Sequence, residues 1–237
     1  MKKIHYSWIV LAVSFLAIIV AGIIRSSSGV FIEPFEQEFD WGRPSISFAF
    51  AMSLFLYGLS GPFMAAFVER FGLRKVMLYS MGLLVIGLSL TFVMKTEWQL
   101  MLIWGVMIGV GSGLFLTVLS AQVANRWFVK RRGLAVGILM AATATGQLVL
   151  LPVLAWLVSE YSWRTAILLI FGLGICMFIL IAIVMRNYPR DVGIPPLGET
   201  ELAPEVTPPV GNPFKIAIAV LFEALRVKEF WLLAGSF

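Results

Sequence analysis

The sequence predicts an all-α integral membrane protein, because its composition and the length of its apolar runs exclude a soluble domain. Of its 237 residues, 60% are hydrophobic and only 13% are charged, and the mean hydropathy is +0.94. The apolar residues form long runs, and a membrane span needs about 20 of them. Backbone groups in lipid must hydrogen-bond internally, so such continuous runs predict helices rather than a β-barrel.

Six runs are long enough to cross a bilayer. We expect the spans at about 8–31, 44–67, 75–94, 98–124, 134–158 and 163–185. The first run has no small-x-small cleavage site and continues into Arg25, so we interpret it as a retained helix rather than a signal peptide. The acidic stretch from Glu33 to Arg43 is expected to be a solvated loop.

The positions of lysine and arginine predict the orientation. The first, third and fifth connections carry one base each, namely Arg43, Lys95 and Arg164. All the other connecting bases lie on the opposite side, which the positive-inside rule assigns to the cytoplasm together with the amino terminus. We therefore expect a multi-pass protein of the cell membrane, either plasma or inner. The formal charge of +5 is explained by topology, so the expected partner is the lipid bilayer and not nucleic acid.

Several classes of chemistry are excluded by what the sequence lacks. Cys176 is the only cysteine and lies in an apolar run, so no internal disulfide forms. His5 is the only histidine and precedes the first span, so neither a metal site nor an intramembrane serine–histidine dyad can be built. Paired membrane aspartates and Asn-Pro-Ala repeats are also absent. We expect a protein that is not an enzyme and that uses no cofactor.

The fourth span is rich in glycine, within the run WGVMIGVGSGL. No strand precedes this run, so a dinucleotide-binding loop is excluded. Small residues at this spacing allow helices to approach closely in a membrane. We expect close helix packing at Gly105, Gly109, Gly111 and Gly113.

A very short basic turn connects the second and third spans. It resembles the Gly-x-x-x-Asp-Arg-x-Gly-Arg-Arg/Lys loop of the major facilitator superfamily. Arg70, Gly72 and Lys75 match that pattern, whereas Ala65 and Glu69 depart from it.

A second motif, NRWFVKRRGLAVG at 125–137, follows the fourth span. It resembles the Tyr/Trp-Phe-x-Lys-Arg-Arg-x-Leu-Ala-x-Gly signature of the monocarboxylate-transporter and oxalate:formate-exchanger branch. The resemblance implies the six-helix amino-terminal half of a twelve-helix major facilitator fold, built from two three-helix inverted repeats. It also implies a second six-helix half as a partner.

The composition changes after Met185, where a proline-rich stretch begins. We expect a six-helix bundle at 1–186 and a flexible cytoplasmic linker at 187–227 that could include a surface helix. Residues 228–237 are expected to be the truncated start of a seventh helix, because so few residues cannot span a bilayer.

Arg25 is the one charge well inside a predicted span, where a guanidinium is costly unless it faces a polar cavity. The resemblance implies anion binding here, because monocarboxylate transporters carry a lysine at the matching position. The alternative is an arginine that snorkels to the outer headgroups. Further candidates for substrate binding are Tyr57, Gln122, Asn125 and Gln147, for which contacts between helices are the alternative.

The two basic turns are interpreted as a conformational latch, since the resemblance implies residues that stabilise one access state. This predicted latch consists of Glu69, Arg70, Gly72, Arg74, Lys75, Arg131 and Arg132.

The hypothesis that follows is a secondary transporter of small organic anions, monocarboxylate-like or oxalate-like, working by alternating access. The alternatives are a major facilitator transporter of an unrelated small solute and a membrane protein that transports nothing. The choice between symport and antiport stays open.

Overall fold

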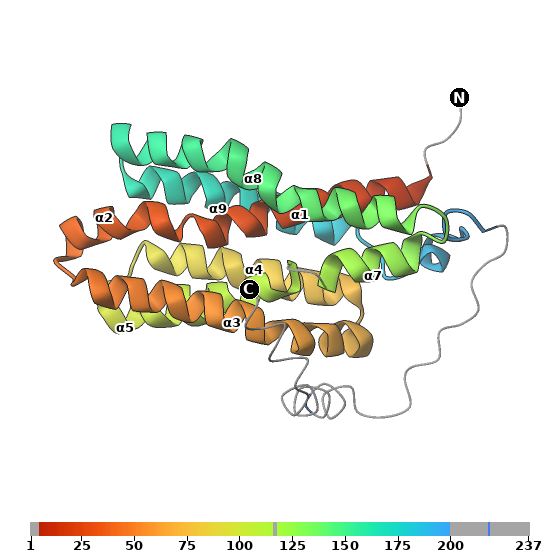
Figure 1. Cartoon of the computed structure of the whole chain (residues 1–237), viewed down its shortest axis with the longest axis horizontal. Coiled ribbons are helices and arrows are strands. Elements are labelled where there is room, and N and C mark those ends of the chain that lie inside the picture. The colour runs from red at the N-terminus through yellow and green to blue at the C-terminus, as the bar shows by residue number, and fades with distance from the viewer. Residues whose placement is uncertain (1–4, 116–117, 200–217, 219–237) are drawn as a thin grey trace, which may run out of the picture.

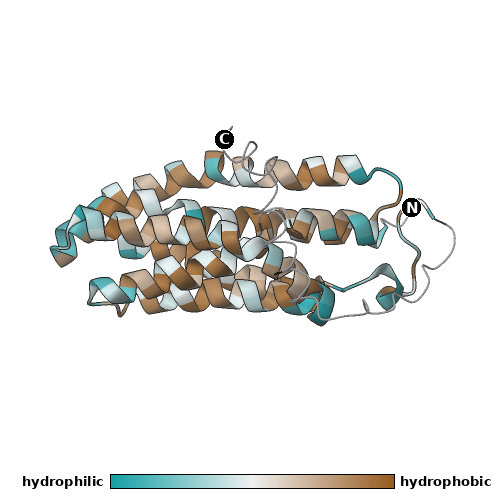
Figure 2. Cartoon of the chain, turned by 60° about the horizontal axis from the view of Figure 1, so that its bottom comes forward, coloured by the Kyte–Doolittle hydropathy of each residue, from teal (hydrophilic) through white to brown (hydrophobic). Residues whose placement is uncertain are grey.

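The structure is a computed structural model that describes residues 5–115, 118–199 and 218, and these residues form a bundle of long helices (Figure 1). Six helical spans in the described ranges are long and apolar enough to cross a membrane, which confirms the predicted fold class. Hydrophobic residues cover the length of the bundle and hydrophilic residues gather at its two ends (Figure 2). This distribution matches a bilayer with water on both sides.

The spans follow one another with short turns. The first joins α1 (Tyr6–Ser26) to α2 (Ser28–Phe39), the second is α3 (Arg43–Phe71), and the third is α4 (Leu73–Thr91). The fourth combines α5 (Glu97–Leu100), a π-helical stretch (Met101–Ile108), α6 (Gly109–Ser112), a 3-10 turn (Gly113–Phe115) and α7 (Val118–Trp127). The fifth is α8 (Arg132–Glu160), the sixth is α9 (Trp163–Val184), and a 3-10 turn at Pro189–Val192 follows.

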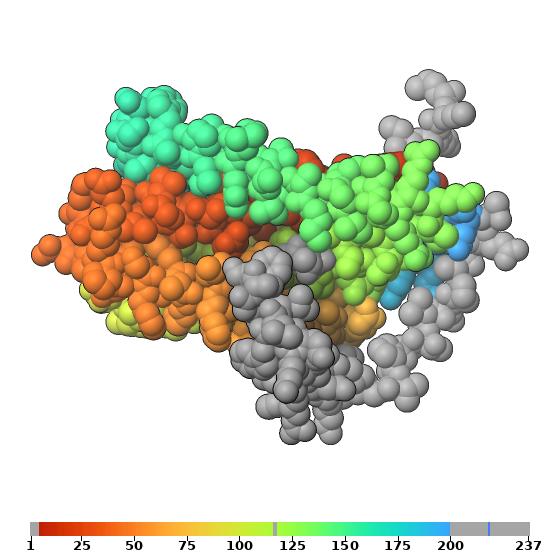
Figure 3. All heavy atoms as spheres, viewed as in Figure 1, coloured from red at the N-terminus to blue at the C-terminus, as the bar shows by residue number. Residues whose placement is uncertain are grey.

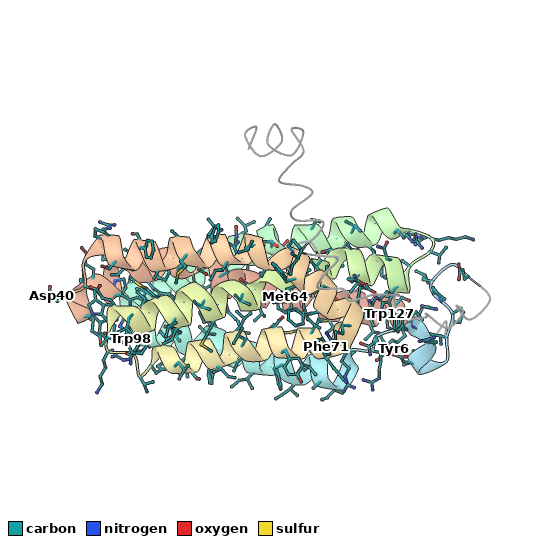
Figure 4. All side chains as sticks on the ribbon, turned by 90° about the horizontal axis from the view of Figure 1, so that it is seen from below. Tyr6, Asp40, Met64, Phe71, Trp98 and Trp127 are labelled. Atoms are coloured by element: carbon teal, nitrogen blue, oxygen red, sulfur yellow. The ribbon has the colours of Figure 1, made fainter. Side chains whose placement is uncertain are left out.

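The end of the bundle with the α3–α4 and α7–α8 turns is called the basic end below, and the other end is called the distal end. Figure 4 shows Asp40 and Trp98 at the distal end, and Phe71, Trp127 and Tyr6 toward the basic end.

The first span is longer than predicted, and this corrects the expected acidic loop at 33–43. The chain stays helical to Phe39, so Glu33, Glu36 and Glu38 lie on α2 and the turn before α3 is short. The cause is an aromatic face: Phe31 and Phe35, four residues apart, are fully buried, and both rings pack against Trp104.

The pairing of helices is consistent with two inverted three-helix repeats. The first span packs on α8, the α3 helix packs on the fourth span, and α4 packs on α9. If the first three spans are exchanged with the last three, the pairs 1–5 and 2–4 map onto each other and the pair 3–6 maps onto itself. Because each repeat has an odd number of spans, the second repeat begins at the opposite end of the bundle.

The glycines of the fourth span pack closely against neighbouring helices, as predicted. Gly111 lies against Ser80 and Leu84 of α4, and the other three glycines lie against the backbone of α3. A β-carbon added at Gly109 would lie 2.8 Å from the carbonyl oxygen of Ser53. Added at Gly113, it would lie 3.3 Å from the carbonyl oxygen of Tyr57. Gly105 makes the same kind of approach one turn earlier, so glycines four residues apart form one face of the span.

The α8 helix runs along the edge of the bundle, with much of its length at the surface (Figure 3). Only 22% of its most apolar window is buried, and Leu148 is 79% exposed. Such an apolar surface is stable when lipid or further helices cover it.

The glycine face yields a matched pair of variants. Gly109→Ala should lower the free energy of unfolding of the solubilised protein by about 1–3 kcal/mol, because the new β-carbon overlaps α3. Gly172→Ala on α9 should be neutral or stabilise by about 0.5–1 kcal/mol, since nothing lies within 4 Å of its added β-carbon. Thermal unfolding in one detergent measures both variants, and equal melting temperatures would contradict the packing described here.

Candidate functional site

Arg25 lies near the middle of the first span rather than near its end. The span Tyr6–Phe39 has 34 residues, which corresponds to about 51 Å of helix, and Arg25 is about 4 Å from its midpoint. Another 14 residues, about 21 Å of helix, separate Arg25 from Phe39. The next charged residue of this span is Glu33, eight residues or about 12 Å of helix beyond Arg25, so the Arg25 variants described below are needed to separate a binding cation from a snorkelling one.

The Arg25 guanidinium lies over an aromatic ring of the neighbouring span. Its central carbon is 4.6 Å from the centroid of the Tyr57 ring, and Tyr57 is at the midpoint of α3. A cation–π contact offsets part of the cost of desolvating the charge. Among the described residues, no carboxylate lies within ion-pair distance of Arg25. Within the described residues, the Arg25 guanidinium therefore contacts an aromatic ring and has no counter-ion.

The α8 helix packs closely on α1 next to the position of Arg25. A β-carbon added at Gly22, one turn before Arg25, would lie 3.7 Å from the Thr143 methyl carbon. One added at Gly146 would lie 3.3 Å from the backbone oxygen of Ile19. Gln147 follows directly and lies at the middle of α8, half-buried. Polar groups of α1, α3 and α8 therefore share the middle level of the bundle.

The other two predicted binding residues lie elsewhere. Gln122 and Asn125 are about 15 and 20 Å from the midpoint of the fourth span, near the basic end. The Gln122 amide donates a hydrogen bond to a Glu69 carboxylate oxygen at 3.0 Å. Asn125 is exposed, two residues before the end of α7. The structure thus separates Gln122 and Asn125 from Arg25, Tyr57 and Gln147.

Glu69 at the basic end joins α3 to α7. Besides Gln122, it accepts a hydrogen bond from Arg126 at 3.1 Å, in an ion pair whose arginine side chain is only 8% exposed. The Arg126 guanidinium also lies 4.7 Å from the centroid of the Tyr188 ring. Sequence analysis counted Arg126 only as a topological base. Its position four residues after Gln122 on one helix face could have suggested a common partner.

The α3–α4 turn depends on a side chain from beyond α9. Gly72 has φ +88° and ψ 152°, a conformation that is essentially restricted to glycine. A β-carbon there would lie 2.8 Å from the side-chain amide oxygen (Oδ1) of Asn187. That same oxygen accepts a hydrogen bond from the Arg74 backbone N–H at 2.9 Å and so caps α4. The Arg74 guanidinium donates to the Ala182 carbonyl oxygen at 2.5 Å.

The described part of the predicted 187–227 linker, residues 187–199, makes hydrogen bonds to the bundle. The Leu197 N–H donates to the Trp127 carbonyl at 2.9 Å, and its carbonyl accepts from Val129 at 3.0 Å. The residues beyond 199, including the expected seventh helix, lie outside the described part of the chain except for Ile218.

The remaining residues of the predicted latch lie apart from the Glu69 cluster. Arg70 lies over the Phe71 ring at 5.3 Å, and Arg132 donates to the Phe128 carbonyl at 2.7 Å. Arg131 has φ +69° at the start of α8. Lys75 is exposed on the first turn of α4.

A second charged contact closes the distal end. The Glu38 carboxylate accepts hydrogen bonds from the Trp163 indole and from both terminal nitrogens of Arg164. Glu38 is thus part of a contact between α2 and α9, and the expectation that these acids form a purely solvated face is wrong for this residue. Sequence analysis missed the pair because it placed Glu38 in a loop.

Comparison with protein families matches residues 14–237 to the Major Facilitator Superfamily. The chain belongs to this superfamily. It is 28% identical over 171 residues to monocarboxylate transporter 13 of Bos taurus, which covers 72% of this chain and 40% of that protein. It is 31% identical over 158 residues to the fujikurins efflux protein of Gibberella fujikuroi, covering 63% of this chain and 33% of that protein.

Similarity to monocarboxylate transporter 12-B of Danio rerio extends over 98% of the chain at 24% identity and covers 51% of that relative. The chain thus spans between about a third and a half of the length of these relatives. The superfamily match covers the six described spans, which have the arrangement of an amino-terminal six-helix half, and the chain is similar to several monocarboxylate transporters.

The Gly72 turn yields a second matched pair. Gly72→Ala should destabilise the protein by about 1–3 kcal/mol more than Gly193→Ala. Both glycines have positive φ, but only the β-carbon at position 72 meets another side chain, that of Asn187. Thermal unfolding measures the difference, and adding Asn187→Ala to Gly72→Ala should recover part of it. Equal losses for the two single variants would show that Asn187 does not constrain the turn.

Proposed function

We propose that the full-length protein is a secondary active transporter of small organic anions that works by alternating access, with Arg25 as the anion-binding cation. The observation that supports this most directly is a guanidinium in the middle of a continuous membrane span without a carboxylate partner among the described residues. Such a charge is costly unless it faces a polar cavity and meets an anion.

The chemistry of this middle level suits a carboxylate. A guanidinium can donate two parallel hydrogen bonds to one carboxylate, which fixes the orientation as well as the charge. The Tyr57 ring lies against one face of the guanidinium, and Gln147 carries an amide at the middle of α8. We propose Arg25, Tyr57 and Gln147 as the binding residues of this half, with Gln122 and Asn125 acting at the basic end.

The basic end is proposed to face the cytoplasm of a cell membrane, because most of the connecting lysines and arginines lie there. A second six-helix half, reached through the segment 187–227 and a seventh helix that begins near 228, would form the other wall of the pathway. The latch then has a core of Glu69, Arg126 and Gln122. Its proposed surface residues are Arg70, Gly72, Arg74, Lys75, Arg131 and Arg132.

Arg25 also bears on the coupling mechanism. Arginine stays protonated at any accessible pH, whereas a desolvated lysine can lose its proton. A proton relay through the first span is therefore disfavoured. We propose anion exchange, or proton coupling through an acid outside the six described spans.

A second candidate is efflux of a larger organic product. The Gibberella fujikuroi relative supports it, because its name describes an efflux protein and its identity to this chain is 31%. Counterflow in liposomes discriminates the two proposals. Accumulation of labelled small monocarboxylate against internal unlabelled monocarboxylate supports the first, and its absence supports the second or a different solute.

The binding role of Arg25 predicts two graded effects in reconstituted full-length protein. Arg25→Ala should weaken binding of small carboxylates by about 10- to 100-fold, the range for hydrogen bonds to a charged group. Arg25→Lys should retain part of the affinity and introduce a dependence on pH. Equilibrium binding across pH measures both effects.

The matched control is Arg43→Ala, which removes an exposed arginine at the distal end and should leave affinity unchanged. Unchanged affinity in correctly inserted Arg25→Ala would contradict the binding role. A nearly silent Arg25→Lys combined with poor insertion of Arg25→Ala would identify a structural arginine instead.

A further inference from the structure

A groove separates α3 from α4 toward the basic end. It has a volume of about 430 Å³ and is formed on the α3 side by Met64, Phe67 and Phe71. These residues are three and four positions apart, so they form one stripe along the helix. Gly111 of the fourth span contributes to the lining between the two helices. Figure 4 shows Met64 and Phe71 on this part of α3.

The α4 side of the groove repeats this pattern. Lys75, Tyr79 and Leu83 follow one another at intervals of four residues and face the α3 stripe across the groove. Tyr79 is 75% exposed and Phe71 is 44% exposed, so the groove opens to the outside of the described bundle. In a membrane, acyl chains or further helices cover such an apolar surface, and the charge at one end of the groove favours a lipid.

One end of the groove is charged. Lys75 is exposed at its rim on the first turn of α4, and no carboxylate of the described residues lies within ion-pair distance of it. The amino-terminal end of a helix adds a partial positive charge at this position. An ammonium group at headgroup level beside an apolar groove is complementary to a phosphate that carries an acyl chain.

We propose that this α3–α4 groove binds one anionic glycerophospholipid, with an acyl chain along the two stripes and the phosphate at Lys75. The aromatic rings of Phe67 and Phe71 would line the acyl chain. The Tyr79 ring, with its hydroxyl group, lies on the same face of α4 as Lys75. The site uses neither Arg25 nor the Glu69 cluster, and it shares only Lys75 with the surface residues of the proposed latch.

The test places a photoreactive benzoyl-phenylalanine at Phe67 of the full-length protein. The matched control position is Ile179 on α9, which is 51% exposed and lies at a similar distance from the basic end of its helix. Both variants are reconstituted in phosphatidylcholine vesicles that contain a minor fraction of phosphatidylglycerol. Mass spectrometry then measures the lipids crosslinked at each position.

The probe at Phe67 should enrich phosphatidylglycerol over its bulk fraction by about fivefold, the factor that one lysine near an anionic headgroup supplies. The probe at Ile179 should follow the bulk fraction. Lys75→Gln should abolish the enrichment, whereas Lys95→Gln, which removes an exposed lysine at the distal end, should preserve it. Leu83→Trp, which fills the groove without changing charge, should reduce all lipid crosslinking at Phe67.

Three results would overturn the proposal. The first is an equal lipid ratio at Phe67 and Ile179. The second is enrichment that survives Lys75→Gln. The third is crosslinking of the Phe67 probe mainly to the chain itself, which would show that protein and not lipid covers the groove.

Discussion

The glycine contact between the fourth span and α3 is the constraint on which the rest of the bundle depends. In lipid, helices gain no hydrophobic free energy from pairing, so association relies on close packing of small residues. Gly109 brings the fourth span within van der Waals contact of the α3 backbone. The two ends of that span are then fixed, with Trp104 in the aromatic contacts of the distal end and Arg126 beside Glu69 at the basic end.

Between these ends, the middle of the bundle combines rigid packing with one costly charge. The α1 and α8 helices approach closely at Gly22 and Gly146, which sets the level at which Arg25 meets the Tyr57 ring. A guanidinium at this depth is stable only if the structure provides it with a polar environment. The contacts at both ends hold the helices whose middles form that environment. Packing and the proposed binding of anions thus depend on the same helices.

The number and approximate positions of the spans could be predicted from the sequence, because a span's length and apolarity are local properties. The end of the first span could not be located by charge alone: Glu33, Glu36 and Glu38 resemble a loop, although the phenylalanines four residues apart indicate a helix. The contacts of Asn187 with Gly72 and of Gln122 with Glu69 join residues more than 50 positions apart. Such contacts depend on tertiary packing. The spacing of Gln122 and Arg126 indicates that they can share a partner, but no local pattern identifies that partner as Glu69.

The central claim is that the level of Arg25 and Gln147 lines a water-filled anion pathway, and cysteine accessibility tests it directly. Cys176 is exposed on α9, so a Gln147→Cys variant is made in a background that carries Cys176→Ser. The account predicts that a charged, membrane-impermeant thiol reagent modifies this cysteine in reconstituted full-length protein and that small carboxylates slow the reaction. A cysteine at position 147 that stays unreactive, or that reacts at the same rate with and without carboxylate, would contradict the account.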